Sequence, residues 1–368
     1  MSLWTRTSPL DAAQERQQET WSLTSGGGQA QSFQLDVKTG KPLDVMGLKN
    51  SSLAETREYA EMLASRAMKL YGTGMHLIKI ASCTCCGSSL SEAAECLRIF
   101  DVPYHRCPRC GHVMVKRRPD GEDLNFQESA EVSQTYVDPS TCEVRLSQVI
   151  APKVEWMNEV YAKLRGRRPA SVVDVGAGGG HFVEGVRRAG TAASGFELSK
   201  ASRAFAKAAF GLDLRSDDFL SAQLNQVDLI TMWGLLEYVQ EPRRFLDRAR
   251  AALTADTGML VVEVPRFDAL GTASQAVNPR NVARHMDPTT HINCFSDSSL
   301  ATVLVGAGFA PVAVWYFGMD AYELLVQCAL RGGDDAAFSA LVDMIPVLQC
   351  TLDSARCCDD IIVAAVPV

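Results

Sequence analysis

The chain has 368 residues, of which 47% are hydrophobic and 21% charged, and it carries a formal net charge of −7. This length predicts more than one structural unit, and the acidic balance argues against a protein built to bind the phosphate backbone of a nucleic acid. The first 20 residues include five charged side chains and no apolar run, and no segment approaches the roughly 18 consecutive apolar residues of a membrane span. We therefore expect a soluble, cytoplasmic protein without a membrane partner, whose twelve cysteines are metal ligands or buried thiols.

The first 80 residues are predicted to form an extension with one helix. Residues 1–50 are polar and rich in turn residues, including a glycine run at 26–28, which indicates a loosely structured segment. Ser52 and Glu55 form a capping box, and apolar residues recur at helical spacing as far as Leu70. A helix is therefore expected over residues 52–71, with Gly72 at its end.

Two Cys-x-x-Cys pairs with 20 residues between them predict a zinc ribbon over residues 81–125. Four thiolates at this spacing can close a tetrahedral zinc site, and the glycine after each pair allows the tight turn that directs backbone N–H groups toward sulfur. Four protein ligands leave no open coordination position, so the zinc is expected to be structural. The predicted ligands are Cys83, Cys86, Cys107 and Cys110. Cys85, His105 and His112 are less favoured substitutes.

From residue 170 onward, strand, loop and helix patterns alternate. Strands are expected over 171–175, 193–197, 227–232 and 259–264, and helices over 143–165, 200–210 and 243–253. Alternating segments of these lengths predict an α/β fold, with a parallel sheet covered by helices on both faces. Two further strands over 311–317 and 359–366 are expected to complete the sheet, with a helical insertion over about 331–356 between them.

The first of these strands leads into a glycine-rich loop. It ends in Asp174 and continues as Asp-x-Gly-x-Gly-x-Gly into a helix. Glycine lets the backbone approach a ligand closely, and the free N–H groups of the following helix can meet that ligand. A dinucleotide-binding fold would instead carry Gly-x-Gly-x-x-Gly, with an acidic residue about 20 positions later.

Acidic and aromatic residues mark the ends of the next strand-like segments. Glu197 ends the second segment, and its two carboxylate oxygens could accept hydrogen bonds from both hydroxyls of a ribose. The third segment ends in Asp218 and Phe219, which could hold the amino group and the ring of adenine. The fourth ends in Trp233-Gly234 and is followed by Glu237-Tyr238.

In this order and at these distances, the four segments resemble the class I S-adenosylmethionine (SAM)-dependent methyltransferases. The resemblance covers residues 170–317 and implies a Rossmann-like sheet of seven strands in a methyltransferase domain over residues 126–368. The residues that it assigns to SAM are Asp174, Gly176, Ala177, Gly178 and Gly180 for the methionine half, Glu197 with Leu198 for the ribose, Asp218 and Phe219 for the adenine, and Trp233 and Gly234 near the sulfonium.

The methyl acceptor is expected beyond the carboxyl ends of the strands, near an insertion over about 265–296. His291 begins a run that resembles a His-x-x-x-Phe-Ser-x-x-Ser-Leu signature of related methyltransferases. It is either a general base or substrate contact, or it fixes the loop through a backbone carbonyl. Tyr238 stands where many relatives have a histidine, and it would need a strongly lowered pKa to act as a base. The catalytic candidates are His291, Tyr238 and His285.

Other polar side chains near this region have two possible roles each. Arg266 and Arg284 either pair with an anionic substrate or are solvated. His181, after the glycines, either contacts the cofactor or packs at the start of its helix. Cys294 is expected to act as a small apolar side chain.

Together, these features predict an enzyme that transfers a methyl group from SAM to O, N or C of a small metabolite, in secondary-metabolite or sugar biosynthesis. A zinc ribbon before this core resembles bacterial small-molecule methyltransferases, including sugar C-methyltransferases. The ribbon and the helix at 52–71 are expected to form part of the substrate pocket or a lid. The sugar enzymes carry a further large C-terminal domain, for which the residues after Phe317 are too few.

Two alternative functions stay open. Some ribosomal RNA methyltransferases also place a zinc ribbon before this core, but residues 81–150 hold 7 Lys and Arg against 10 Asp and Glu, which disfavours a nucleic-acid partner. The second alternative is a catalytically degenerate module that binds a partner protein, and the intact glycine loop and Glu197 argue against it. The sequence leaves the oligomeric state open.

Overall fold

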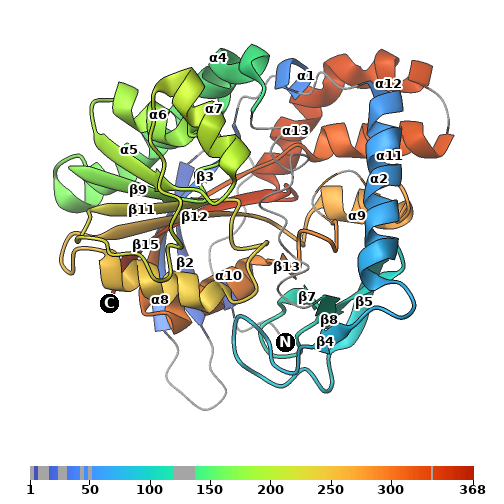
Figure 1. Ribbon diagram of the computed structural model, residues 1–368, viewed down its shortest axis with the longest axis horizontal. Coiled ribbons are helices and arrows are strands. Elements are labelled where there is room, and N and C mark those ends of the chain that lie inside the picture. Colours follow the sequence, from blue (N-terminus) through green and yellow to red (C-terminus); the bar gives the residue numbers. More distant parts are fainter. Residues whose placement is uncertain are drawn as a thin grey trace.

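A computed structural model describes residues 4–6, 16–23, 31–41, 45–48, 52–119, 137–282, 284, 286–332 and 335–368. Within these residues, a nine-stranded sheet lies at the centre of the molecule (Figure 1). Its strand order is β1-β2-β3-β14-β15-β12-β11-β9-β10. The predicted α/β fold is confirmed, and the sheet is larger than the seven strands expected.

The part of the sheet formed by residues 171–367 has six strands. These are β9 (Ser171–Val175), β10 (Ala192–Phe196), β11 (Leu229–Trp233), β12 (Met259–Pro265), β14 (Phe309–Phe317) and β15 (Asp360–Pro367). The first four are parallel, and β15 runs antiparallel between β12 and β14. The third predicted strand-like segment forms only an isolated bridge between Phe196 and Arg215, because charged residues follow at once and cannot occupy a buried strand.

Three strands from the N-terminal region extend this sheet, which differs from the loosely structured segment expected over residues 1–50. They are β1 (Trp4–Arg6), β2 (Arg16–Leu23) and β3 (Gln31–Thr39), and β3 pairs in parallel with β14. The physical reason is alternation: Leu35 and Val37 are buried, and Gln34, Asp36 and Lys38, which alternate with them, are polar. A high polar content concealed this period-two pattern. The domain boundaries at residues 80 and 125 stay predictions.

Successive residues of the central strands enter two different cores, one on each face of the sheet. Val173, Ile230 and Leu260 pack with side chains of α8 (Pro242–Ala252) and α10 (Asp297–Gly306). Their neighbours Val172, Leu229 and Val261 pack with side chains of α5 (Ala151–Arg165) and α6 (His181–Arg188). Figure 1 shows these two helix pairs on opposite sides of the sheet. The continuous apolar runs of the strands are explained by this burial on both faces.

The connecting helices mostly match the predicted ranges. Helix α7 (Lys200–Phe210) begins and ends as expected, whereas the predicted helix at 143–165 divides into α4 (Cys142–Arg145), a π-turn (Leu146–Ile150) and α5. The region of the predicted helical insertion holds α12 (Asp335–Leu341) and α13 (Ile345–Ser354), separated by a short 3-10 turn before Pro346. Proline favours the first turn of a helix, and Pro152 and Pro346 are the second residues of α5 and α13. The two prolines account for the residues at which these helices begin.

The cysteine-rich segment forms a separate small sheet in the order β13-β7-β6-β5. Its strands are β5 (Ala94–Ile99), β6 (Val102–Arg106), β7 (Val113–Val115) and β13 (Asn293–Cys294), and a second pair joins β4 (Leu77–Lys79) to β8 (Arg117–Pro119). Helix α2 (Leu53–Tyr71) packs on this module through Leu63 and Ala67. Strand β13 belongs to the predicted substrate-side insertion, so that insertion and the ribbon form one sheet.

Most of the remaining described helices lie on the side of the molecule that carries α2 (Figure 1). Helix α9 (Leu270–Val277) and helix α11 (Asp320–Gly332) pack together beside α2, and α1 (Val45–Leu48) lies near α12 (Figure 1). None of the helices in the described ranges is both long and apolar enough to cross a lipid bilayer.

Candidate active site

The glycine loop after β9 adopts a conformation that only glycine reaches without strain. Gly176, Gly178 and Gly180 have φ angles of +77°, +51° and +78°. The N–H groups of Gly176 and Ala177 both donate to the carbonyl oxygen of Phe196, each at 2.9 Å. The loop is therefore fixed against the end of β10, at the carboxyl edge of the parallel strands.

Glu197 connects the glycine loop to the segment after β10. Its Oε2 accepts a hydrogen bond from the N–H of Gly178 at 2.7 Å, and its Oε1 accepts one from the N–H of Ser199 at 2.7 Å. Each carboxylate oxygen keeps a second lone pair for another donor. Two backbone contacts therefore hold the carboxylate in one orientation, and it can still accept hydrogen bonds from two hydroxyl groups.

Asp174 lies at the buried end of β9, with 2% of its surface exposed. Its Oδ1 accepts a hydrogen bond from the hydroxyl of Thr231 at 2.7 Å, and burial raises the pKa of the carboxyl to about 7. Nearby, Lys153 of α5 forms a buried ion pair with Glu263 of β12, and its ammonium lies 4.7 Å from the centre of the Trp233 ring. The carboxyl edge of the sheet therefore carries several buried charges.

The residues predicted for adenine lie further along the same edge. Phe219 is buried and packs against the rings of Phe196 and Phe245, with centroid distances of 5.4 and 6.2 Å. Asp218 is exposed, and its Oδ1 accepts a hydrogen bond from the N–H of Leu220. The roles of Asp218, Phe219 and the exposed Leu198 in cofactor binding stay predictions.

The residues at the strand ends are suited to SAM in their chemistry. Gly176, Gly178 and Gly180 have no side chain that could obstruct a ligand. A Cβ on Gly234, whose φ is +60°, would lie 3.2 Å from Glu237 Oε1. The oriented Glu197 carboxylate offers acceptors for a diol. His181, in contrast, packs at the start of α6 between the rings of Phe205 and Phe210, the second of its two predicted roles.

The four predicted metal ligands are brought together. The sulfur atoms of Cys83, Cys86, Cys107 and Cys110 all lie within 4.8 Å of one another. The separations Cys83–Cys110 and Cys86–Cys107 are 3.6 and 3.7 Å, close to the ~3.8 Å between thiolates around a tetrahedral zinc ion with bonds of about 2.3 Å. Cys85, His105 and His112 do not belong to this group of four cysteines. The described residues contain no other group of this kind.

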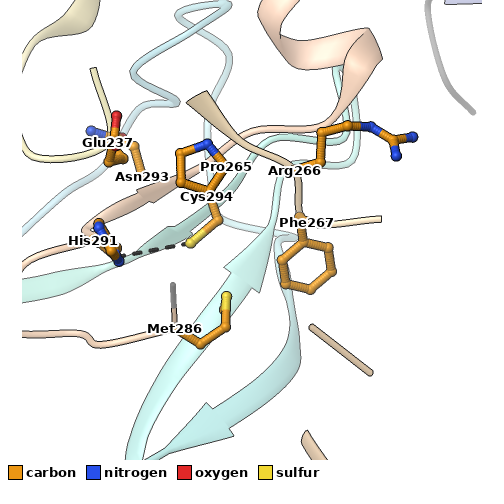
Figure 2. Close-up of a pocket in the computed structure, with 8 residues that line it drawn as sticks. All are labelled: Glu237, Pro265, Arg266, Phe267, Met286, His291, Asn293 and Cys294. Carbon is orange, nitrogen blue, oxygen red and sulfur yellow. Dashed lines mark hydrogen bonds between the residues drawn. The ribbon is translucent and has the colours of Figure 1, made fainter. Parts of the chain in front are cut away.

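A small pocket opens between the ends of β11 and β12 and the ribbon (Figure 2). Its lining consists of Glu237, Pro265, Arg266, Phe267, Met286, His291, Asn293 and Cys294. Glu237 is 3% exposed, and its Oε2 has no hydrogen-bond partner among the described residues. Burial raises the pKa of this carboxyl to about 8, so it is mostly protonated at neutral pH.

Two of the three catalytic candidates are in contact, and one of them, His291, lines this pocket. The rings of His291 and Tyr238 meet edge to face, with their centroids 4.8 Å apart. The backbone carbonyl of His291 accepts hydrogen bonds from the Tyr104 hydroxyl of the ribbon and, at 3.8 Å, from the Cys294 thiol (Figure 2). His285 lies outside the described residues. Cys294 is buried with the ribbon core, as a small apolar side chain would be.

Neither arginine of the insertion is available to bind an anion, and neither is solvated. Arg266 is buried and pairs with Asp297 at 2.6 Å, and its Nη1 donates to the carbonyl oxygens of Arg356 and Cys358. Arg284 pairs with Asp359 at 2.7 Å and lies near further carboxylates. Both predicted roles were wrong, because the partners of these two residues come from α10, from α11 and from residues 356–360. Sequence spacing does not reveal such distant partners.

Glu237 is not among the residues that the sequence predicts for the site. A signal was present in the sequence, because Glu237 lies only three positions after Gly234, the glycine that directly follows the buried strand β11. The Lys153–Glu263 pair was also missed. Lys153 lies on a helix whose pattern resembles an ordinary amphipathic one, and only the packing of α5 against β12 reveals its partner.

Residues 152–314 match the model of a family described as a methyltransferase domain. A search among curated proteins found no match.

Three solved structures among those similar to this chain were determined with S-adenosyl-L-homocysteine (SAH). The plantazolicin methyltransferase BamL is 13% identical, with a TM-score of 0.43, and the match covers 67% of this chain and 97% of that one. For an O-methyltransferase from a trans-AT PKS multienzyme of Brevibacillus brevis, the values are 11%, 0.41, 64% and 79%. For geranyl diphosphate C-methyltransferase from Streptomyces coelicolor A3(2), they are 14%, 0.39, 68% and 88%.

Proposed function

We propose that this chain, which contains a methyltransferase domain over residues 152–314, transfers a methyl group from SAM to O, N or C of a small molecule. The observation that carries the proposal is the Glu197 carboxylate, which Gly178 and Ser199 hold in one orientation beside a left-handed glycine loop at the carboxyl edge of the sheet. This is the edge at which ligands of parallel α/β sheets bind.

The chain's own residues would hold the cofactor along this edge. Asp174 and the glycine loop would face the methionine half, Glu197 would accept hydrogen bonds from the ribose hydroxyls, and Phe219 would lie near the adenine. When bound, SAM supplies a methyl group on a positively charged sulfur that a nucleophile can displace in line. The four-cysteine cluster would hold a structural zinc ion, since four thiolates leave no open position for chemistry.

The acceptor would bind in the pocket between Glu237 and His291. Methyl transfer requires that the nucleophile lies about 3 Å from the methyl group and loses its proton where it carries one. Because the pKa of Glu237 is about 8, a fraction of this side chain is ionised at neutral pH. That carboxylate can take a proton from a hydroxyl or an amine. His291 is the second candidate for this step, Tyr238 supports its ring, and His285 stays a weaker candidate.

The pocket favours a neutral, largely apolar acceptor. Phe267, Met286 and Pro265 contribute apolar surface, and the guanidinium of the lining, that of Arg266, is already paired with Asp297. A bound anion would also disfavour the carboxylate form of Glu237, which the proposed proton transfer needs. Secondary metabolites with a hydroxyl or amino group meet these conditions, and a nucleic-acid backbone does not.

The proposal is tested by transfer of label from methyl-tritiated SAM into an extract of the source cells, separated by size and by sensitivity to ribonuclease. We expect label in the low-mass fraction, lost in Asp174→Ala and kept in Asp247→Ala, a matched change of an exposed aspartate on α8. Ribonuclease-sensitive label in the large fraction would replace this proposal with RNA methylation. Absence of transfer together with absence of SAH binding would support the degenerate binding module.

A further inference from the structure

One buried side chain, that of Asn293, lies where the cysteine ribbon meets the pocket. Asn293 is 1% exposed and begins β13, which pairs with β7 of the ribbon through Met114. The same residue lines the pocket beside Glu237, and its backbone N–H donates to the carbonyl oxygen of Glu237 at 3.2 Å (Figure 2). It therefore belongs to the ribbon and to the pocket at the same time.

The side-chain amide of Asn293 uses all of its hydrogen-bonding groups. Its Nδ2 donates to the carbonyl oxygens of Val239 at 2.7 Å and Leu236 at 3.4 Å. Two carbonyl oxygens can only accept, so the amide nitrogen must face them and the amide oxygen must face the ribbon. That oxygen accepts from the Thr84 hydroxyl at 2.9 Å and lies 3.1 Å from His112 Nε2, which must therefore carry its proton.

The two donors come from the two cysteine knuckles. Thr84 directly follows the predicted ligand Cys83, and His112 comes two residues after the predicted ligand Cys110. The turn that contains each pair of cysteines therefore sets the position of the donor beside it. Those turns are closed by Gly87 and Gly111, whose N–H groups donate to the carbonyl oxygens of Cys83 and Cys107. A metal ion that ties the four sulfurs together would thus fix both donors of Asn293 with respect to each other.

We propose that Asn293 is a positioning residue, through which the metal-binding knuckles hold the segment 236–239 and the Glu237 side chain in the acceptor pocket. The inference rests on the proposed function, because that function assigns the pocket to the acceptor. The ribbon then has a defined role, since its metal maintains the acceptor side of the site. The cofactor side, built by Glu197 and the glycine loop, does not depend on that metal.

The first test is Thr84→Val, which removes the hydroxyl donor and keeps the shape of the side chain. Ser89→Ala in the same knuckle is the matched control, because the Ser89 hydroxyl bonds only near the surface, to Ser91. Hydrogen exchange measured by mass spectrometry should become about fivefold faster in peptides that carry the amides of Asn293 and Tyr238, the factor expected for loss of one buried hydrogen bond. In the control, exchange should stay as in the unchanged protein.

Two further measurements separate positioning from general instability. SAH affinity by calorimetry and bound zinc by mass spectrometry should be unchanged in Thr84→Val, and the KM for the acceptor found in the labelling experiment should rise while kcat changes less. In the double variant with Asn293→Ala, exchange should be no faster than in Asn293→Ala alone, because both changes break the same connection.

Removal of the metal from the full chain by a chelator should accelerate exchange at the same two amides. The proposal is overturned if exchange there is unchanged in Thr84→Val, if it changes only within the ribbon after chelation, or if SAH affinity falls together with it. Exchange and calorimetry need no acceptor, so a failure of methyl transfer and a failure of this coupling can be distinguished.

Discussion

At the scale of single residues, the shape of the proposed cofactor site depends on positions where no side chain fits. Gly195 in β10 is the clearest case. A Cβ there would lie 2.8 Å from Cβ of Ala177 and 3.0 Å from Cγ2 of Val183, both of which belong to the glycine loop or the helix after it. Because real Cβ atoms do not approach so closely, any larger residue would push the loop away from β10.

We therefore expect Gly195→Ala to lower the free energy of unfolding by about 1–3 kcal/mol, as overpacking in a core does, and to weaken SAH binding. Gly332→Ala is the control, since a Cβ on Gly332 meets nothing within 4 Å. Urea unfolding gives the first quantity and calorimetry the second. Equal stability of the two variants would contradict the packing described for β10.

Glu237 makes a second prediction at this scale, which concerns pH. Burial raises the pKa of its carboxyl from 4.5 to about 8, so the folded chain binds this proton more tightly than the unfolded chain does. The resulting stability is fully present below pH 4.5 and is lost as the pH rises through 8. Glu237→Gln imitates the protonated form and should escape this loss.

We therefore expect the free energy of unfolding of Glu237→Gln to rise relative to that of the unchanged protein as the pH is raised from about 5 to about 8.5. The expected change in the difference between the two proteins is at least about 1.4 kcal/mol. Urea titrations at several pH values measure it. Glu155→Gln, at an exposed position of α5, should show no such shift. A pH-independent difference for Glu237→Gln would mean that the carboxyl is not buried as described.

At the scale of elements, the strands and helices of residues 152–314, which match the model of a methyltransferase domain, could be predicted because local pattern and final burial agree. Strand β9 and helix α7 begin and end at the predicted residues, and each is followed directly by a glycine. The predicted metal ligands were also found together, since Cys-x-x-Cys spacing brings the ligands of each pair together before the chain folds.

Elements that depend on distant partners could not be predicted. Strand β13 has two residues and exists only because Asn293 and Cys294 meet β7, which lies far earlier in the chain. Strand β3 needs β14 as its neighbour, and the partners of Arg284 come from the C-terminal region. Local periodicity contains no information about such contacts, whereas the site is largely made of them.

Helix α5 and strand β12 are joined by the buried pair of Lys153 and Glu263, which gives a prediction about elements. Lys153→Met alone should lower the free energy of unfolding by about 3–5 kcal/mol, because it leaves a buried carboxylate without its partner. Adding Glu263→Gln should restore part of that loss. A double-mutant cycle in urea tests this, and simple additivity of the two changes would contradict the pairing.

At the scale of the whole molecule, two sheets meet near the proposed acceptor pocket. The main sheet presents the ends of β9, β10 and β11, where Asp174, Glu197 and the glycine loop lie. The ribbon sheet takes in β13 and so approaches the same edge from the other side, and α2 packs along it (Figure 1). The pocket itself is lined by residues within 237–294, so the expectation that the ribbon and the helix at 52–71 form part of the substrate pocket or a lid stays a prediction.

The central claim is that the carboxyl edge of the main sheet binds SAM through Glu197, and calorimetric titration with SAH tests it most directly. We expect one site per chain, and binding about tenfold to a hundredfold weaker in Glu197→Gln, the range for loss of hydrogen bonds to a charged group. Glu155→Gln should bind as the unchanged protein does. No binding of SAH or SAM by the folded, metal-loaded chain, or equal affinity in Glu197→Gln, would contradict the account.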